Sequence, residues 1–535
     1  MTMQLKTNLK ELLFFLPLIL ILDIPFIVFA LKQASFWYIL AIFASLTIPL
    51  LILIVFRIKP FLFILLSFPI LYLSLSFDVL VFDYNSYYNI STWSAVFDTN
   101  PQESKEFLGI LRPLSWAIGI IQILTVFLYL VLTIFKKKKI YFTPSFRHIA
   151  TGLLLIFILD FFIGKIVNKA YPFGHTLHSF IAYQKQSELE EKLLPQKNSY
   201  HYQATENKEF KQDSLPRTIV VLITESLRRD HLGYYGYLRN TSPEMGQENL
   251  VIYTDLISPA NQTVNSLRRV FSQAEGNNDT LYFAKPSIIT AFNEAGYHTA
   301  WYSTQSVGKN GESKNSVIAK ESDTAVFRNN NHLDTVLLKD IQKALQDTTP
   351  KKLIFVHVFG VHYLYNHRFP KEFTHFSKQK TADYQQDQIN KYDDAILYND
   401  YFQHEIIKML KKQKGEKIFI SFSDHGESLF ESGPHIQGHG ALQPAKAEFN
   451  VPFILWFSNE YRENHPEIVQ NVIQHQNLPA TNEDFFYSFP YLAGITFEEL
   501  KPEKNFFTNQ YNHKKDRKVV NSALDLLSYQ KLKGK

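Results

Sequence analysis

Five long apolar runs dominate the first third of the chain. A helix needs roughly 20 apolar residues to cross the hydrocarbon core of a bilayer. The runs that reach this length cover approximately residues 12–30, 36–56, 60–82, 114–135 and 148–167. The first run is too long, and too soon followed by the next, for a cleaved signal peptide. The pattern therefore predicts five transmembrane helices, the first of them a retained anchor.

Positive charges lie in the short loops at one end of these runs. Lys6 and Lys10 precede the first run, Arg57 and Lys59 separate the second from the third, and four lysines occupy 136–139. The positive-inside rule assigns such loops to the cytoplasm. Because five crossings are an odd number, the N-terminus is predicted in the cytoplasm and the rest of the chain outside.

The remaining sequence alternates continuous apolar runs with longer amphipathic segments. Strand-like runs lie at 218–226, 298–304, 352–362, 417–423 and 451–458, and helix-like segments at 263–274, 287–297 and 392–413. Continuous apolar strands that alternate with helices indicate a largely parallel sheet covered on both faces. We therefore predict a transmembrane domain at 1–170 with an outer loop at 83–113, a linker or bridging segment at 171–215 that is charged and turn-rich over 185–215, and a soluble α/β/α domain at 216–535.

Composition narrows the possible functions only slightly. The net charge of +5 on 535 residues is mild and gives no sign of nucleic-acid binding. The chain has no cysteine, so neither a disulfide framework nor a thiolate metal ligand is available.

Acidic and histidine residues follow several of the predicted strands. Glu225, His362, Asp424 and His425 each come where a strand is expected to end, and sites in such sheets gather beyond the carboxyl ends of the strands. Glu225, Asp424 and His425 are an oxygen, oxygen and nitrogen set, which suits Zn²⁺ or Mn²⁺ and does not exclude Mg²⁺. Glu427 either orients a ligand or joins a second metal ion.

A threonine is the candidate nucleophile. Thr263 precedes a helix-like segment, where free N–H groups and the helix dipole attract an anion. A metal-activated hydroxyl at that place is suited to attack a phosphate, whereas the alternative is a simple helix cap. His362 and His439 could steady the transferred group or act as general acid. His435 competes with His439, and His357 lies inside a strand, which indicates packing.

Several motifs together resemble the phosphoethanolamine transferases of Gram-negative bacteria, in the alkaline phosphatase and sulfatase superfamily. They are VVLITESLRRDHLGYYGYLRNTSP (220–243), NQTVNSL (261–267), GYHTAWYSTQ (296–305), VHVFGVHYLYNHRFP (356–370), YDDAILYNDYF (392–402) and SDHGESLFESG (423–433). They occur in the order in which the family has them, and the apolar N-terminal half resembles the family architecture as well.

The resemblance implies a role for particular residues. It implies a catalytic zinc ion, with a second ion left open, bound by Glu225, Thr263, Asp424 and His425. Thr263 would be the residue that becomes modified, and His362 and His439 would contact the transferred group. In the outer loop, FDTNPQES (97–104) resembles the segment that binds the donor lipid. The substrate-binding residues are then Thr99 and Glu103, together with Glu427.

The resemblance also implies a reaction. Phosphoethanolamine would pass from phosphatidylethanolamine to lipopolysaccharide, on lipid A or a core sugar, through a covalent phospho-threonine. The chain would lie in the inner membrane as a monomer, with its soluble domain in the periplasm. Two alternatives stay open, a phosphoglycerol transferase acting on a glucan or other surface polymer and a non-enzymatic membrane sensor. The sequence does not choose between a lipid A phosphate, a heptose and Kdo as acceptor.

Overall fold

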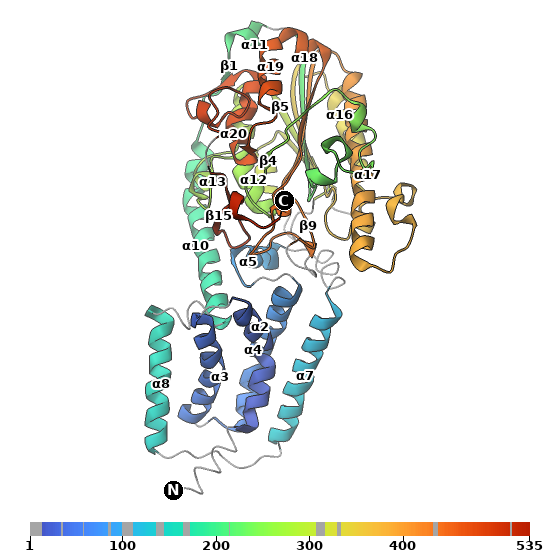
Figure 1. Cartoon of the computed structure of the whole chain (residues 1–535). Coiled ribbons are helices and arrows are strands. Elements are labelled where there is room, and N and C mark those ends of the chain that lie inside the picture. The colour runs from blue at the N-terminus through green and yellow to red at the C-terminus, as the bar shows by residue number, and fades with distance from the viewer. Residues whose placement is uncertain are drawn as a thin grey trace. The chain divides into compact units, whose positions relative to one another are not determined.

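The chain forms two compact units. The computed structural model describes residues 13–33, 36–56, 58–83, 87–98, 111–134, 144–163, 172–212, 215–305, 316–328, 333–431, 437–513 and 516–534. The helical unit comprises Met1–Ser94 and Ser104–Lys185, and the sheet unit comprises Ala95–Glu103 and Gln186–Lys535. Both are drawn in Figure 1. The two boundaries inferred from the sequence, after residues 170 and 215, stay predictions.

The helical unit contains apolar helices that match the hydrophobic runs. They are Leu13–Leu22, α2 (Ile24–Gln33), α3 (Phe36–Phe56), α4 (Pro60–Asp78) with a π-helical turn at Val79–Asp83, α5 (Ile90–Asp98), α7 (Pro113–Ile134) and α8 (Pro144–Ile163). Among the described residues, three helices are long and apolar enough to cross a membrane: α3, α4 with its π-helical turn, and α7. The helix Leu13–Leu22 and α2, which are bent by 65° relative to each other, could together form a fourth span.

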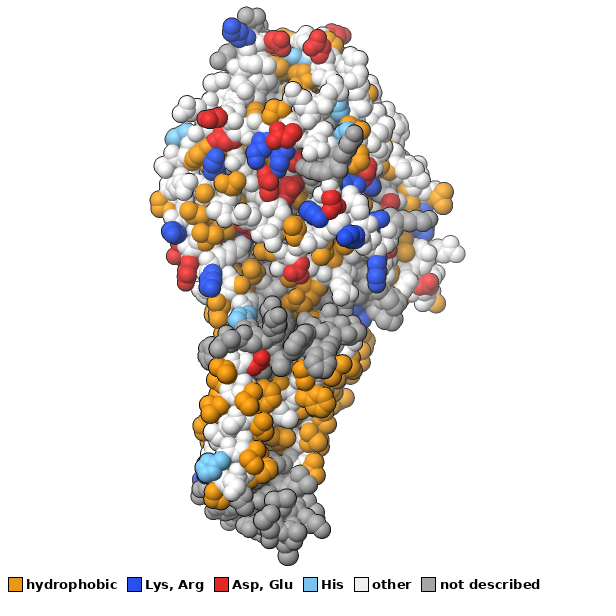
Figure 2. Space-filling view, turned by 60° about the vertical axis from the view of Figure 1, so that its left-hand side comes forward, with side chains coloured by type: hydrophobic (Ala, Val, Ile, Leu, Met, Phe, Trp, Pro, Cys, Tyr) orange, Lys and Arg blue, Asp and Glu red, His pale blue; other side chains and the backbone are white. Residues whose placement is uncertain are grey.

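The count of five spans is not confirmed by these helices. The fifth run overlaps α8, whose last side chains lie outside the described residues. The lysines at 6, 10 and 136–139 and Arg57 also lie outside them, so the orientation stays a prediction. Large hydrophobic side chains, among them Phe127 and Ile156, are exposed on the helical unit. Figure 2 shows hydrophobic side chains gathered over the surface of its helices. A surface of this kind is typical of contact with lipid or with another protein.

The segment expected as a turn-rich linker is largely one helix. Helix α10 (Pro172–Ser199) has 28 residues. Glu188 and Lys192 are spaced to support each other on its surface, while Leu189 and Leu193 pack against the core of the sheet unit. The expectation of turns was therefore wrong for residues 185–199, where the four-residue spacing of these two leucines is consistent with a helix.

The sheet unit is built on seven strands. Their order is β3 (Leu250–Ile252), β11 (Phe453–Phe457), β8 (Glu416–Ser423), β2 (Arg217–Thr224), β7 (Lys351–His357), β5 (His298–Ser303) and β6 (Thr324–Phe327). Strands β8, β2, β7, β5 and β6 are parallel, and β11 pairs antiparallel with both β8 and β3, so that β11 alone of the seven runs in the opposite direction. The predicted largely parallel sheet is confirmed.

Helices cover both faces of this sheet. On one face Ile219, Val221 and Ile223 of β2 pack with α12 (Thr263–Phe271), α14 (Ile288–Glu294), α19 (Pro466–His475) and α20 (Phe485–Ser488). On the other face Val220 and Leu222 pack with α16 (Leu338–Gln346) and α17 (Tyr384–Lys411). Because both faces are buried, β2 reads in the sequence as a continuous apolar run.

Short elements complete the sheet unit. The helices are α11 (Lys208–Gln212), α13 (Thr280–Ala284), α15 (Ser316–Ala319) and α18 (Asn459–Asn464). The paired strands are β1 (Thr205–Glu206) with β13 (Ile495–Thr496), β4 (Leu256–Ile257) with β12 (Ala480–Thr481), β9 (Ser428–Leu429) with β10 (Gln437–Gly438), and β14 (Lys518–Val520) with β15 (Leu526–Ser528).

Candidate functional site

The predicted metal ligands meet at the carboxyl edge of the sheet. Glu225 directly follows β2, and Asp424 and His425 directly follow β8. These strands are parallel neighbours in register, with Thr224 opposite Ser423, so their ends bring the three side chains together. Thr263 is the first residue of α12.

The four side chains converge within hydrogen-bonding distance. The Thr263 hydroxyl donates to Glu225 Oε1 at 2.9 Å and lies 3.3 Å from His425 Nε2. His425 Nε2 is 3.0 Å from Glu225 Oε1 and 3.4 Å from Asp424 Oδ2. The potential ligand atoms of Glu225, Asp424 and His425 all lie within 4.8 Å of one another. Residues that are up to two hundred positions apart in the chain therefore share one centre.

Thr263 is not the residue that caps α12. The N-cap is Gln262, in an extended conformation and without a side-chain cap hydrogen bond. The helix-cap alternative for Thr263 is therefore wrong. As the first helical residue, Thr263 carries its hydroxyl at the positive end of a nine-residue helix, where an anion is favoured.

The backbone of Asp424 also holds α12, the helix that begins at Thr263, in position. The hydroxyls of Ser258 and Ser266 both donate to the Asp424 carbonyl oxygen at 2.5 Å. Ser266 belongs to α12, one turn after Thr263. The backbone of a predicted metal ligand and the helix that carries the candidate nucleophile are therefore joined directly.

The turn after β2 depends on close backbone packing. Ser226 has φ = 59°, and its carbonyl accepts a hydrogen bond from the Tyr392 hydroxyl at 2.7 Å. Gly360 has φ = 52°, and a Cβ at this position would lie 2.8 Å from the Glu225 backbone nitrogen. Only glycine fits there without displacing Glu225.

The charges of this centre call for a cation. Asp424 Oδ1 accepts from the backbone N–H groups of Ser226 and His425, whereas Oδ2 is buried without a hydrogen-bond partner among the described residues. Burial raises the pKa of Asp424 well above its usual value, and the charge of Glu225 adds to this effect. An orphaned buried carboxylate oxygen is costly unless a cation meets it.

Burial and neighbouring charges also shift the pKa values of His425 and Glu225. Burial favours neutral His425, yet the carboxylates of Asp424 and Glu225 raise its pKa to about 10. Burial would raise the pKa of Glu225, but the charge of His425 outweighs this effect and lowers it. A proton on His425 thus supplies the positive charge that a metal ion would supply instead. The donor set fits a divalent ion such as zinc.

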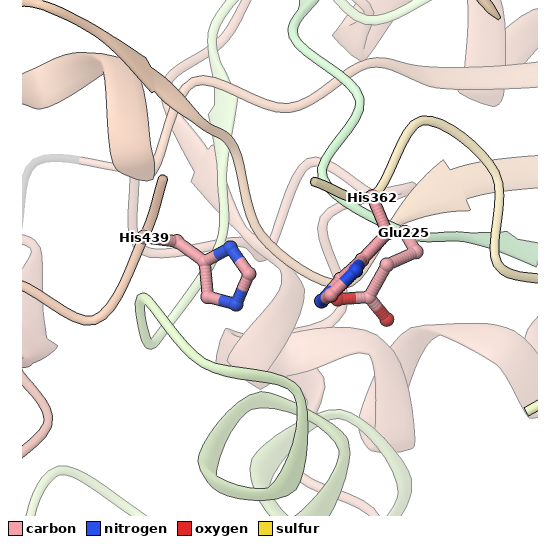
Figure 3. A group of neighbouring side chains, drawn as sticks. All are labelled: Glu225, His362 and His439. Atoms are coloured by element: carbon pink, nitrogen blue, oxygen red, sulfur yellow. The ribbon is translucent and has the colours of Figure 1, made fainter. Parts of the chain in front are cut away.

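Two histidines border this centre. His362, Glu225 and His439 have potential ligand atoms within 4.8 Å of one another, and Figure 3 shows His439 facing the pair from the opposite side. Burial lowers the pKa of His362 to about 3, so its ring is neutral near pH 7. His439 Nδ1 lies 2.8 Å from Glu427 Oε2, and the Tyr365 hydroxyl donates to Glu427 Oε1 at 2.7 Å.

Of the remaining predicted residues, the structure describes Glu427 and His357. Glu427 is fully buried and already has two partners, and a third potential ligand group consists of His425, Glu427 and His439. His357 lies inside β7, buried and edge-on to Trp301, as expected for a packing residue. Thr99, Glu103 and His435 lie outside the described residues.

Reasoning from the sequence missed one side chain in contact with the centre. The Gln305 amide donates to Glu225 Oε2 at 2.9 Å and to the Val358 carbonyl at 3.1 Å. Gln305 follows β5 after a single intervening residue. The rule that sites gather at strand ends, applied to this strand as well, would have found it.

Comparison with known proteins agrees with this geometry. Phosphoethanolamine transferase EptC of Escherichia coli (strain RS218) is 26% identical over 468 residues, with 80% of this chain and 79% of the relative covered. Phosphoethanolamine transferase CptA of Salmonella typhimurium is 26% identical over 472 residues, with the same coverage of 80% and 79%. The resemblance drawn from the motifs is confirmed.

Solved structures share the fold. The zinc complex of the C-terminal periplasmic domain of EptC from Escherichia coli has a TM-score of 0.55 and 27% identity over 62% of this chain and 96% of that domain. The integral membrane lipooligosaccharide phosphoethanolamine transferase A from Neisseria meningitidis has a TM-score of 0.63 and 19% identity over 83% of this chain and 88% of that one. The sulfatase family model matches residues 217–495. The match covers more than half of the chain, and the protein belongs to the sulfatase family.

Proposed function

We propose that this protein transfers phosphoethanolamine from phosphatidylethanolamine to lipopolysaccharide, with Thr263 as the covalent carrier. The observation that carries the proposal is the Thr263 hydroxyl at the start of α12, 2.9 Å from Glu225 Oε1 and 3.3 Å from His425 Nε2. Relatives named phosphoethanolamine transferases match about four fifths of the chain. The apolar helices would anchor the protein in the inner membrane, where a lipid donor lies, with the sheet unit in the periplasm.

The metal would be held by Glu225, Asp424 and His425 with the Thr263 hydroxyl. These are ligand types that zinc takes, and a related domain was solved as a complex with zinc. A bound zinc ion would polarise the phosphate and favour the ionised form of a hydroxyl. A second ion would be held by the third potential ligand group, which consists of His425, Glu427 and His439.

The first half of the reaction forms the phospho-threonine. Thr263 Oγ attacks the phosphorus of the donor, the bond from phosphorus to the glycerol oxygen breaks, and diacylglycerol leaves. The threonine proton moves along its existing hydrogen bond towards Glu225 Oε1. The N–H groups at the start of α12 favour the extra negative charge of the transition state. His439, oriented by Glu427, would give a proton to the leaving oxygen.

The second half returns Thr263 to its free state. A phosphate or hydroxyl oxygen of lipid A or a core sugar attacks the phosphorus, the bond to Thr263 Oγ breaks, and the proton held by Glu225 returns to Thr263. Where the attacking group is a hydroxyl, its proton passes to His439, which restores the starting state. The two halves make a ping-pong cycle with a covalent intermediate. His362, neutral because its pKa is lowered to about 3 by burial, can accept a hydrogen bond from the acceptor hydroxyl.

Mass spectrometry of lipopolysaccharide tests the proposal. Cells that lack their own phosphoethanolamine transferases would be compared with and without this protein, and with Thr263→Ala as the control. We expect lipopolysaccharide to gain the mass of phosphoethanolamine with the native chain only. Equal modification by Thr263→Ala would overturn the covalent mechanism. A phosphoglycerol adduct on trapped Thr263 would instead support the phosphoglycerol transferase.

A further inference from the structure

The end of the chain is folded onto the site rather than trailing from it. Strands β14 and β15 pair antiparallel, with Val520 opposite Leu526, and Figure 1 labels β15. The turn between them is held by Asn521, whose Oδ1 accepts from the N–H groups of Ala523 and Asp525 at 3.0 and 2.9 Å. Val520 and Asn521 are almost completely buried. We call residues 517–533 the C-terminal hairpin.

The C-terminal hairpin is bonded to the loop that leads to Thr263. This nucleophile loop, residues 258–262, follows β4. Val520 N–H donates to the Pro259 carbonyl at 2.9 Å, and Asn261 N–H donates to the Val520 carbonyl at 3.4 Å. Thr263 is two residues farther on, so the hairpin holds the backbone immediately before the nucleophile.

The same hairpin is bonded to the loop that carries His439. This histidine loop covers residues 439–450. The Asn521 amide Nδ2 donates to the Leu442 carbonyl at 2.9 Å, three residues after His439. Farther along, Lys446 N–H donates to the Lys533 carbonyl at 2.9 Å, and the Tyr529 hydroxyl bonds Asn450 Oδ1.

The two loops also touch each other beneath the hairpin. The Asn261 amide donates to Glu448 Oε2 at 2.7 Å and to the Ala441 carbonyl at 3.0 Å, and Ala441 N–H donates to the same Glu448 oxygen at 3.1 Å. Asn261 and Glu448 are fully buried. A Cβ on Gly440 would lie 2.7 Å from the Gln262 amide nitrogen, so the loops are packed without spare room.

We propose that the C-terminal hairpin is a positioning element of the transferase, with Asn521 as its key residue. Neighbouring residues of one hairpin, Val520 and Asn521, hold the backbone before Thr263 and the backbone after His439. The hairpin thereby fixes the distance between the nucleophile and the histidine that protonates the leaving group. This inference rests on the proposed function.

One substitution removes the tie and keeps the two backbone hydrogen bonds of the turn. Asn521→Asp retains an oxygen that accepts from the N–H groups of Ala523 and Asp525, but it replaces the amide that donates to Leu442 and, within the turn, to Asp525 Oδ2 at 3.0 Å. Lys518→Ala is the matched control, because the Lys518 side chain is exposed on the same hairpin and pairs only with Asp516 among the described residues. The full chain in detergent would be given a fluorescent phosphatidylethanolamine, and release of diacylglycerol would be measured. Active sites would be counted by the mass of modified Thr263.

The expected result is a loss of turnover in folded protein. A misplacement on the order of 1 Å costs roughly 100-fold in rate, so we expect Asn521→Asp to lower kcat per active site about 10- to 100-fold. KM for the donor should change little, and Lys518→Ala should match the native chain. In a His439→Ala background, Asn521→Asp should cause no further loss, because it acts through His439.

Three outcomes would overturn the inference. They are an unchanged kcat per active site, an equal loss in the His439→Ala background, and a loss explained entirely by fewer folded molecules. If Asn521→Asp does not fold, a chain ending at Lys531, which loses the bond from Lys446 to Lys533, gives the same test. Failure of the native chain to release diacylglycerol would refute the proposed function instead, before any variant is compared.

Discussion

Gly360→Ala should disable the enzyme while leaving it folded. Gly360 lies three residues after β7 and presses against the backbone of Glu225. A Cβ there would lie 2.8 Å from the Glu225 nitrogen and 3.0 Å from its carbonyl oxygen. Ordinary van der Waals contact begins near 3.4 Å, so Glu225 or the 359–362 turn must move by about 0.6 Å.

Two magnitudes follow from this geometry. Alanine at φ = 52° costs about 1–2 kcal/mol in the left-handed region, which lowers Tm by a few degrees in a domain of this size. A shift of about 0.6 Å at a metal ligand beside the nucleophile is expected to lower kcat by roughly 10- to 100-fold. Activity should therefore fall far more than stability.

The assay compares two glycines with different surroundings. Gly246→Ala is the control, because nothing lies within 4 Å of its added Cβ. Thermal unfolding, zinc content and release of diacylglycerol would be measured for both variants. If Gly360→Ala keeps the zinc content and the kcat of the native chain, Glu225 is not held in place by this contact and the reasoning is refuted.

Three further predictions concern the metal and two buried charges. Chelation should abolish transfer and lower Tm, because the lost ligand stabilised only the folded state, and added zinc should restore both; activity that survives complete metal removal would contradict the centre. Burial raises the pKa of Asp334 to about 6, so its contribution to stability is complete below about pH 4 and is lost as the pH rises through 6. Relative to Asp334→Asn, the native chain should lose up to about 3 kcal/mol over that interval, which urea unfolding at several pH values would detect. Arg217→Ala should cost about 3–5 kcal/mol, because Arg217 neutralises the buried carboxylates of Glu416 and Glu206; circular dichroism during denaturation measures this loss.

Much of the sheet and its site could be predicted because the relevant signals are local. A strand buried on both faces must be a continuous apolar run, and Glu225, Asp424 and His425 stand where such runs end. Parallel neighbours place their ends at one edge, so the order of the motifs predicts a meeting point. That reasoning needs no knowledge of loops.

Other features of the fold could not be predicted from the sequence, because most of them depend on contacts between distant segments. The turn after β2 is held by Tyr392 and Gly360, which are more than 130 residues away. The C-terminal hairpin contains strands of only three residues each, too short to show an alternating pattern, and it is hydrogen-bonded to the backbone of the two loops beneath it. In the helical unit, the 65° bend separates Leu13–Leu22 from α2 and falls at Asp23, but the length of the apolar run alone predicts a single straight span.

The hydrogen bonds around Asp424 explain how the proposed nucleophile on a helix is held beside its proposed partners at strand ends. The Asp424 carbonyl receives both Ser258 and Ser266, so the loop before Thr263 and the first turn of α12 are bound to the end of β8. Strand ends supply fixed anionic and imidazole groups, but the positive end of a helix favours a bound phosphate. Thr263, at the first helical position, lies where the strand ends meet the positive end of the helix. Its hydroxyl contacts Glu225 on one side, and the positive end of the helix would favour a substrate phosphate on the other.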